Sequence, residues 1–457
     1  MESKDLILHV LMFPWLAHGH ISPFLELAKR LSRRNFLVHL CSTPPNLASI
    51  EEQLDQKLFP SIHLLQLHLP PSPHLIPQCH STNSLPPHLM PALKTAFDLA
   101  QPSFSSILAT LNPDLLIYDF LQPWAPELAS HFNIPAVLFF TTSATAISFL
   151  RSSEKGDEFP FPEIRINERE ARGLSQMQKS TANGMSDMER VEQCMGRSSD
   201  LILIKTSRQI EAKYIDYFSH LVQKEMVPVG SLVQCSAAYD RSDHFVEWLE
   251  SKERSSVVFV SVGTEYFMCK EERDEVAHGL ELSNVNFIWV VRFHEEEKKT
   301  AMDEALPFGF LERVGSRGMV VQGWAPQLRI LGHPSVGGFL THCGWSSMME
   351  GMWSGVPLIA MPLHLDQPFN ARLVGEMGVG KEVERGREGL FEREEVAKRI
   401  REVAVGEEGE ELRRRAKEIG EKMRKKGDDQ ETDVTVQKLV GLCRNNSTSK
   451  KLGNHPD

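Results

Sequence analysis

The residue types best suited to holding a phosphate occur where an apolar strand candidate, Val336–Leu340, meets a helix candidate. The two are joined by the turn Thr341–Gly344, and the first helical turn that follows carries the hydroxyls of Ser346 and Ser347. Backbone N–H groups at a helix N-terminus point outward and the helix dipole favours negative charge, so this arrangement predicts an anion site. His342 can donate a further hydrogen bond. The alternative is that the two serines only cap the helix.

Glu350 extends this candidate site. It lies three residues after Ser347, about one turn into the predicted helix. Its carboxylate can accept hydrogen bonds from the hydroxyls of a ribose that lies beside the phosphates. This residue could therefore add a ribose contact to the candidate anion site.

His20 is a second candidate for chemistry, in the segment Ala17–Pro23 that follows the first strand candidate. Asp119 directly follows another apolar strand candidate, Leu115–Tyr118. Ligands in open parallel sheets bind at the carboxyl ends of the strands, so the two side chains are predicted to meet at that edge. A carboxylate that holds one imidazole nitrogen leaves the other to act as a general base. The alternative is a structural histidine, which is the role we expect for the neighbouring His18.

Three other kinds of site fail on particular residues. Gly375–Lys381 matches the first seven places of a P-loop, but Glu382 stands where Ser or Thr is needed and no strand precedes it. That stretch is predicted to be a helix-ending turn. The chain has no GxSxG motif and no GxGxxG after the first strand, which disfavours a hydrolase and an NAD or FAD enzyme. The histidines of His63–His88 match no zinc spacing, so no metal is expected.

The elements that must position these residues alternate between apolar strands and helices, twice along the chain. The strand candidates of the first half are Leu6–Phe13, Phe36–Cys41, Leu115–Tyr118, Ala136–Phe140 and Leu201–Ile204. Those of the second half are Val257–Val262, Phe287–Val291, Met319–Val321, Val336–Leu340 and Leu358–Met361. Continuous apolar strands between helices are typical of parallel sheets covered on both faces. The pattern predicts an α/β fold with two doubly wound domains facing a cleft, and a boundary between Gly230 and Asp243.

Three further stretches carry expectations of their own. Pro70–Pro91 contains seven prolines and cannot be a regular helix. Ser152–Ser186 is polar, with several Gly and Pro, and is predicted to be a mobile surface loop. After Glu388 the chain becomes helical and highly charged, which favours a solvated helix face.

Length, charge and cysteine usage bound the class of protein. At about 150 residues per domain, 457 residues suggest two or three domains. A net charge of −11 without a strong basic patch predicts no nucleic-acid partner. The N-terminal apolar run Leu6–Leu16 is too short for a membrane span, which needs about 20 residues, and lacks the flanks of a signal peptide. The seven cysteines are scattered without a CxxC pair, so we expect free thiols and a cytoplasmic protein.

Taken together, the 44 residues Trp324–Gln367 resemble the signature (PSPG) box of plant family-1 UDP-glycosyltransferases. The resemblance extends over essentially the whole chain, from the HGH segment at residues 18–20 to the terminal helices. It implies the GT-B architecture of two Rossmann-like domains, with residues 1–235 binding the acceptor and residues 243–424 binding the UDP-sugar. A C-terminal helix over about 425–445 is expected to pack back on the first domain.

The resemblance also implies a role for each site residue. His20 would be the catalytic base and Asp119 its partner. Trp324 would stack on uracil, with Ala325 and Gln327 lining the uridine pocket. The other implied donor contacts are Glu350 on the ribose, Gly263, Thr264, His342, Gly344, Ser346 and Ser347 around the diphosphate, and Trp345, Asp366 and Gln367 facing the sugar. Most of the family has Asn where this chain has Ser346, so a shorter side chain with a hydroxyl stands there.

The reaction that this resemblance implies is a single inverting displacement that makes a β-glucoside from UDP-glucose, with no cofactor and no metal. Gln367 is similar to the residue of glucose-using members, and its amide offers both a donor and an acceptor to vicinal hydroxyls. Stretches such as LLIYDFLQPWAPELA and MPLHLDQPFNA look like the branch that glucosylates the sugar of an existing triterpenoid, flavonoid or carotenoid-derived glycoside. Transfer to the hydroxyl of a small-molecule aglycone and non-catalytic UDP-sugar binding stay open as alternatives. A monomer is expected.

Overall fold

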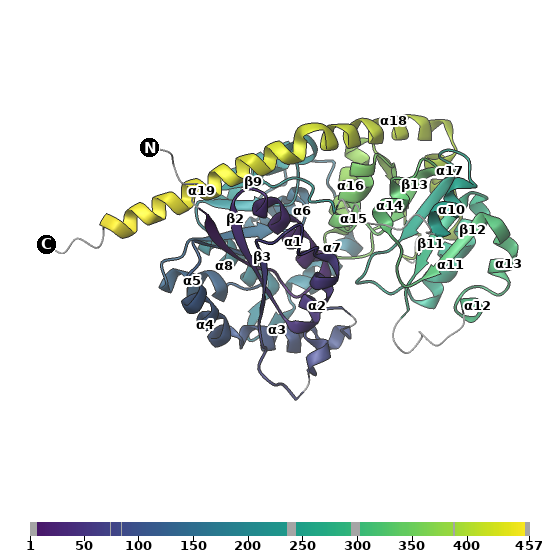
Figure 1. The fold of residues 1–457 in the computed structure, drawn as a ribbon. Helices are drawn as coiled ribbons and strands as arrows, with labels where there is room; N and C mark the ends of the chain where they lie inside the picture. Colours follow the sequence, from purple (N-terminus) through teal and green to yellow (C-terminus); the bar gives the residue numbers. More distant parts are fainter. Residues whose placement is uncertain are drawn as a thin grey trace. The chain divides into compact units, whose positions relative to one another are not determined.

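The computed structural model of the chain describes residues 7–73, 75–83, 85–234, 244–293, 302–386 and 389–452 (Figure 1). The chain divides into two compact units. The first comprises Met1–Arg151, Ser175–Leu232 and Gly427–Asp457, and the second comprises Ser152–Leu174 and Val233–Lys426. The expected domain limits at residues 235 and 243 lie outside the described residues.

The first unit is built on a seven-stranded parallel sheet in the order β3-β2-β1-β4-β5-β8-β9. Its strands are β1 (Leu8–Phe13), β2 (Phe36–Ser42), β3 (Ile62–Gln66), β4 (Leu115–Tyr118), β5 (Ala136–Phe140), β8 (Leu201–Ile204) and β9 (Glu225–Pro228). All five strands predicted for this half are present, and β3 and β9 extend the sheet at its two edges. Because the order reverses between β1 and β4, these neighbours form the switch point at which such sheets bind ligands.

Helices cover both faces of this sheet. They are α1 (His18–Ser32), α2 (Pro44–Gln53), α3 (Met90–Asp98), α4 (Gln101–Leu111), α5 (Trp124–His131), α6 (Ala144–Lys155), α8 (Asp187–Arg197), α9 (Arg208–Val222) and α19 (Asp428–Leu452). On one face, Met12 of β1 shares an apolar cluster with Phe24 of α1 and Leu439 of α19. On the other face, Phe13 stacks on Phe104 of α4, with 4.2 Å between ring centroids. Coverage of both faces accounts for the continuous apolar character of the strands.

The C-terminal helix α19 belongs to the first unit, although the whole second unit precedes it in the sequence. Figure 1 shows it, in yellow, beside β9. The hydroxyl of Thr435 donates to the carbonyl of Pro228 at 3.3 Å, and Nε of Arg34 donates to Asp433 at 2.7 Å. Cys443 is buried in the core of the sheet. The first unit therefore takes its core from both ends of the chain.

The second unit has a six-stranded parallel sheet in the order β12-β11-β10-β13-β14-β15. The strands are β10 (Val257–Ser261), β11 (Asn286–Val291), β12 (Gly318–Gln322), β13 (Val336–Thr341), β14 (Leu358–Ala360) and β15 (Gly380–Glu382). Five of these strands were predicted. The sixth, β15, was not predicted; it begins inside Gly375–Lys381, the stretch that was excluded as a P-loop, and ends one residue after it. That stretch does contain the predicted helix end, because Gly378 closes a helix in the left-handed conformation at φ 64°. The order reverses between β10 and β13, which gives a second switch point.

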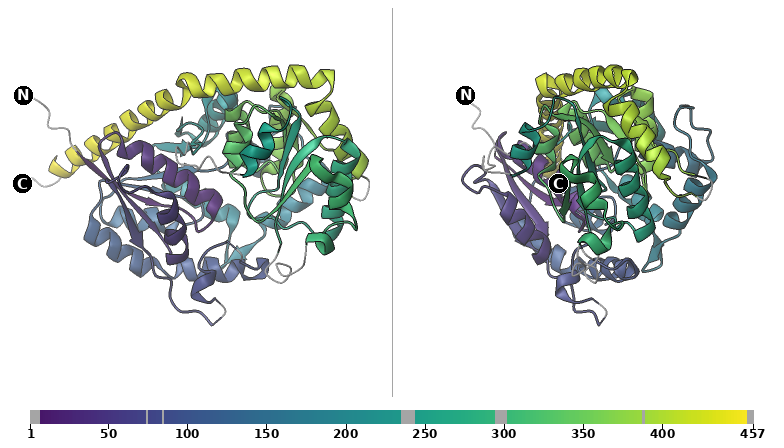
Figure 2. Two further views of the ribbon diagram at one scale, coloured as in Figure 1. Left: turned by 45° about the vertical axis from the view of Figure 1, so that its right-hand side comes forward. Right: turned by 90° about the vertical axis from the view of Figure 1, so that its right-hand side faces the viewer.

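The helices of the second unit enclose its own apolar core. They are α10 (His244–Glu250), α11 (Lys270–Ser283), α12 (Met302–Ala305), α13 (Phe310–Val314), α14 (Gln327–Leu331), α15 (Trp345–Ser354), α16 (Gln367–Met377), α17 (Arg393–Ala404) and α18 (Glu407–Lys422). Val260, Trp289 and Leu340 of three neighbouring strands share one cluster with Val396 and Ile400 of α17. Figure 2 shows the second sheet, in teal to green, from two further directions.

The stretch predicted to be a loop, Ser152–Ser186, instead contains the helix α7 (Glu168–Gln178) and the short hairpin of β6 (Thr181–Ala182) and β7 (Met185–Ser186). Glu170 of α7 accepts two hydrogen bonds from Arg372 of α16, at 2.8 and 3.0 Å. Arg372 also pairs with Glu382 at 2.5 Å. The loop prediction was wrong because ion pairs made far along the sequence hold this polar helix, and short helices depend on such tertiary contacts.

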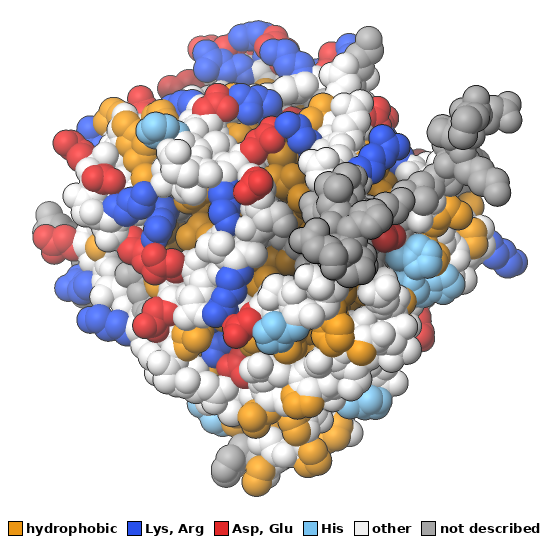
Figure 3. Space-filling model, turned by 90° about the vertical axis from the view of Figure 1, so that its left-hand side faces the viewer, with side chains coloured by type: hydrophobic (Ala, Val, Ile, Leu, Met, Phe, Trp, Pro, Cys, Tyr) orange, Lys and Arg blue, Asp and Glu red, His pale blue; other side chains and the backbone are white. Residues whose placement is uncertain are grey.

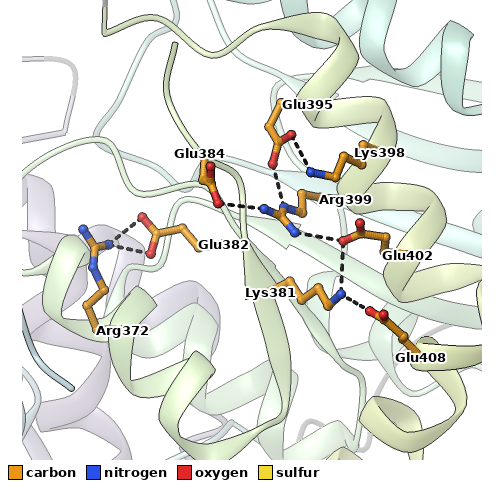
Figure 4. A network of polar contacts seen from close by, with 9 residues as sticks. All are labelled: Arg372, Lys381, Glu382, Glu384, Glu395, Lys398, Arg399, Glu402 and Glu408. Atoms are coloured by element: carbon orange, nitrogen blue, oxygen red, sulfur yellow. Dashed lines mark hydrogen bonds and ion pairs between the residues drawn. The ribbon is translucent and has the colours of Figure 1, made fainter. Parts of the chain in front are cut away.

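The charged stretch after Glu388 is helical as predicted, but part of its charge is paired rather than solvated (Figure 4). Arg399 of α17 is only 14% exposed and contacts Glu395, Glu402 and Glu384 at 2.7 to 2.9 Å. Lys381 of β15 pairs with Glu402 at 3.2 Å and continues the network. These contacts attach α17 to the edge of the second sheet.

Candidate active site

His20 and Asp119 lie together at the switch point of the first unit. The last residues of β1 and β4, Phe13 and Tyr118, are paired in register. Asp119 follows β4 directly, and His20 lies in the first turn of α1, which starts shortly after β1. The parallel pairing therefore brings two residues that are 99 positions apart to one edge of the sheet.

Asp119 is fully buried and holds the imidazole of His20 through Nδ1, at 2.9 Å from Oδ2. Backbone N–H groups fix the carboxylate itself: Trp15 donates to Oδ2 at 3.0 Å and Phe120 donates to Oδ1 at 2.8 Å. Thr141 places its hydroxyl 3.3 Å from the same imidazole nitrogen. With Nδ1 donating to the carboxylate, Nε2 carries the lone pair and can accept a proton. Sequence reasoning missed Thr141, while His18 is exposed on the same helix.

The residues expected around a diphosphate lie together at the switch point of the second unit. β10 and β13 are neighbours, and their last residues, Ser261 and Thr341, are in register. Gly263 follows one strand and His342 the other. The imidazole of His342 packs so closely on the backbone that a Cβ added to Gly263 would lie 2.5 Å from it, and one added to Gly344 would lie 2.4 Å from it. The two glycines are thus required by the ring between them.

His342 is a neutral hydrogen-bonding group. Burial lowers its pKa to about 3, and the neighbouring His364 adds to the lowering. The residue as a whole keeps some exposed surface, but its Nδ1 is buried and makes no hydrogen bond within the described part of the chain. A buried polar atom without a partner is costly.

The turn before α15 has an unusual backbone that a distant side chain supports. Cys343 adopts the left-handed conformation at φ 67°, which is rare for residues other than glycine. Asn370 of α16, fully buried, donates to the carbonyl of Cys343 at 2.9 Å and to the carboxylate of Asp366 at 3.1 Å. Nothing in the sequence pattern pointed to Asn370.

Ser346 and Ser347 do not cap helix α15, which was the alternative to an anion-binding role. The N-cap is Gly344, which has no side chain to accept a hydrogen bond, so Ser346 and Ser347 lie within the first turn and are not the cap. Their hydroxyls are therefore on the part of the helix that attracts anions. Trp345, the first helical residue, is buried at 4% exposure.

The residues expected to bind the nucleoside also lie together. Gln327, at the start of α14, donates to Glu350 at 2.8 Å and lies 3.2 Å from the hydroxyl of Ser347. Ala325 is buried, whereas Trp324 is 67% exposed. An exposed indole face can stack on a planar base.

The sugar end of the site departs from expectation at Gln367. This residue is 3% exposed, and its Oε1 accepts the backbone N–H groups of Leu363 and His364 at 2.9 and 3.0 Å. Its amide therefore offers no free acceptor, in contrast to the donor-and-acceptor role expected from the sequence. Asp366 precedes it as the N-cap of α16. Thr264 is exposed, and its carbonyl accepts a hydrogen bond from Arg292.

The described residues also bear on metal binding, membrane insertion and surface charge. Within the described ranges, no group of three or more His, Cys, Asp and Glu side chains is arranged to hold a metal ion. No helix in the described part of the chain is both long and apolar enough to cross a bilayer. On the face drawn in Figure 3, Lys and Arg side chains alternate with Asp and Glu.

Comparison with known proteins gives consistent matches along the chain. The family described as UDP-glucoronosyl and UDP-glucosyl transferase matches residues 174–404, and the glycosyltransferase N-terminal domain family matches residues 7–233. The chain is 50% identical to UDP-glucosyltransferase 29 of Panax ginseng over 97% of its own length and 99% of the relative. It is 47% identical to the beta-D-glucosyl crocetin beta-1,6-glucosyltransferase of Gardenia jasminoides over 96% and 100% of the two chains.

Among solved structures, the fold is similar to that of UGT73P12 from Glycyrrhiza uralensis, determined with glycyrrhetinic acid 3-O-monoglucuronide. The TM-score is 0.83, the identity 23%, and the match covers 98% of each chain. At that identity the match supports the fold alone. The two doubly wound sheets and their strand orders have the GT-B architecture.

Proposed function

The chain belongs to the UDP-glucoronosyl and UDP-glucosyl transferase family, and from that premise we propose that it transfers glucose from UDP-glucose to a sugar hydroxyl of a small-molecule glycoside. It is a UDP-glycosyltransferase. The observation that carries the proposal is the hydrogen bond between His20 and the fully buried Asp119. A protein that only binds UDP-sugars needs no oriented base, so this pair favours catalysis.

His20 deprotonates the acceptor in the proposed reaction. Nε2 takes the proton of the acceptor hydroxyl while that oxygen forms a bond to the anomeric carbon of the donor. Asp119 stabilises the imidazolium that results, because its carboxylate is already held by two backbone N–H groups. A positioned base of this kind contributes about 10²- to 10⁴-fold in rate.

The second unit stabilises the leaving group. As the new bond forms, the bond between the anomeric carbon and the phosphate oxygen breaks, and UDP leaves with increased negative charge. The N-terminus of α15 faces that charge with backbone N–H groups, and the hydroxyls of Ser346 and Ser347 add donors. His342 donates as a neutral imidazole. Since attack and departure occur on opposite faces of the sugar, α-linked UDP-glucose gives a β-glucoside, and the protein groups supply the charge stabilisation without a metal.

The glycoside acceptor is supported by the relatives and by the position of the Pro70–Pro91 stretch. The Gardenia relative is named for a glucosylated substrate. In this chain, the backbone N–H of Thr82 donates to the carbonyl of Leu16 at 2.9 Å, which attaches part of the Pro70–Pro91 stretch to the loop between β1 and α1. The side chains of His80 and Ser81 in this stretch are buried. This stretch therefore lies next to the loop that leads into α1, the helix that carries His20.

Paired acceptor assays test the proposal. The purified protein is incubated with UDP-glucose and either an aglycone or its monoglucoside, in triterpenoid and flavonoid series, and products are read by mass increments of one hexose. We expect the monoglucoside to be preferred at least tenfold in kcat/KM, which corresponds to about 1.4 kcal/mol. Glucosylation of aglycones alone would refute the glycoside acceptor and leave the donor chemistry intact. Absence of any product, with UDP still bound, would favour the non-catalytic alternative.

We also propose that the enzyme works in the cytosol as a monomer. The cysteines found in the described residues are all free thiols, as in reducing compartments. Light scattering of the purified chain and fractionation of cells that express it test the two statements.

A further inference from the structure

The amide of Gln367 is held in one orientation by three hydrogen bonds. Its Oε1 lies 2.9 Å from the backbone nitrogen of Leu363 and 3.0 Å from that of His364. Both nitrogens are donors, so this atom must be the carbonyl oxygen of the amide and Nε2 must be the donor. The third contact, from Nε2 to Nδ1 of His364, spans 3.1 Å. It follows that Nδ1 of His364 accepts this bond.

The ring of His364 is itself fixed. Burial lowers its pKa, so the imidazole is neutral at ordinary pH and carries its proton on Nε2, consistent with an accepting Nδ1. The ring meets Tyr266 edge to face, with 5.4 Å between centroids. The hydroxyl of Tyr266 donates to the carboxylate of Glu272 in α11, at 2.8 and 2.9 Å. A chain of contacts thus runs from α11 through Tyr266 and His364 to the first residue of α16.

We propose that His364 is a positioning residue that sets the donor-sugar preference of the enzyme by holding the amide of Gln367. Nε2 carries two protons, of which one goes to His364. Since both lone pairs of Oε1 are taken by backbone groups, Gln367 presents a single N–H to the sugar. The amide can therefore donate only to a sugar hydroxyl whose oxygen lies along that N–H direction. A hydroxyl of the opposite configuration does not receive that bond. The inference rests on the proposed function, in which Gln367 faces the sugar of the donor.

Two substitutions separate this role from simple packing. His364→Phe keeps a ring against Tyr266 but removes the acceptor. His364→Asn loses the ring but can place its Oδ1 near the position of Nδ1, so it can still accept from Gln367. A packing role predicts that Phe is tolerated and Asn is harmful, whereas the positioning role predicts the reverse. His278→Phe, on the partly exposed face of α11, is the matched control for replacing a histidine by phenylalanine.

The experiment measures kcat/KM with UDP-glucose and with UDP-galactose, and Kd for UDP, in each variant of the full chain. We expect His364→Phe to lower kcat/KM for UDP-glucose about tenfold, the loss of one hydrogen bond, and to reduce the preference over UDP-galactose by a similar factor. In His364→Phe, Kd for UDP should stay within about twofold of the wild-type value. In His364→Asn, kcat/KM with each of the two sugar donors should stay within about threefold of the wild-type value. In a Gln367→Ala background, His364→Phe should have no further effect on the preference.

Several outcomes would overturn the inference. One is an unchanged sugar preference in His364→Phe while Gln367→Ala does change it; another is an equal loss for both sugars and UDP. Full additivity of the two substitutions would also refute it. A wild-type protein that turns over neither sugar, or a Gln367→Ala variant with an unaltered preference, would instead refute the proposed function or its assignment of Gln367.

Discussion

Gly344→Ala tests whether the close packing around His342 supports catalysis. The backbone of Gly344, at φ −60° and ψ 135°, is one that alanine adopts without strain, so any effect comes from the methyl group. That methyl would lie 2.4 Å from Nε2 of His342, and ordinary contact begins at 3.4 Å, so the ring must move by about 1.0 Å (3.4 − 2.4). Gly263 also lies against this ring, because a Cβ added there would be 2.5 Å from it.

The displacement should cost both stability and rate. Overpacking of this kind destabilises by about 1–3 kcal/mol. At about 2–4 °C per kcal/mol for a unit of this size, the melting temperature of the second unit should fall by about 2–12 °C. Moving a charge-stabilising donor by about 1 Å should lower kcat about 100-fold, which is about 2.7 kcal/mol.

The assay compares kcat with UDP-glucose and the melting temperature in four variants. Gly375→Ala is the control, since a methyl group there meets nothing within 4 Å in helix α16; it should leave kcat unchanged and stabilise by about 0.4–1 kcal/mol. The variants His342→Ala and His342→Ala/Gly344→Ala complete the set. Once the ring is absent, the added methyl has nothing to displace, so the double variant should match His342→Ala. Wild-type kcat and melting temperature in Gly344→Ala, or a double variant that shows both full losses, would refute the reasoning.

Three more expectations concern the base, acid stability and metals. His20→Ala should abolish turnover while calorimetry still detects UDP binding, and Asp119→Ala should lose less because a poorly oriented imidazole still accepts a proton; wild-type turnover in His20→Ala would remove the general-base assignment. Burial lowers the pKa of His39 to about 4, and neither ring nitrogen has a partner in the described residues. Between pH 6.5 and 4 the unfolded chain therefore binds more protons than the folded chain, so the free energy of unfolding decreases as the pH is lowered. In His39→Leu, the urea concentration at the unfolding midpoint should therefore decrease less between pH 6.5 and 4 than it does in the wild type. An equal decrease in the two proteins would contradict this. Excess chelator should leave kcat unchanged, whereas restoration of lost activity by added Mg²⁺ would show that a metal takes part.

The positions of His20 and Asp119 could be predicted from the sequence because each follows a buried apolar strand, and parallel strands end at one edge of a sheet. The same logic placed His342 in the turn between a strand and a helix. In each case the relevant signal is local: a run of apolar residues followed by a polar one. The topology then brings the ends of neighbouring strands together.

Contacts between side chains and distant backbone could not be predicted in this way. Asn370 supports the left-handed Cys343 from the adjoining helix, and no pattern in the sequence marks either residue. Gln367 was expected to offer an acceptor, but two backbone N–H groups of its own loop occupy that oxygen. Helix α7 was missed because its fixing ion pair, Glu170 to Arg372, joins residues 202 positions apart.

The placement of α19 has a consequence for how the protein is made. The sequence of the first unit is interrupted after Leu232 and resumes only at Gly427. Its core therefore lacks Leu439 and Cys443 until that later stretch has been synthesised. At about 5–20 residues per second, the ribosome needs about 10–40 s to add the intervening segment. During that time the surface of the first sheet that α19 later covers is exposed on a nascent chain. The second unit has no such delay, because every strand of its sheet precedes α19. We therefore expect the second unit to complete its fold first during translation, although the first unit leaves the ribosome earlier.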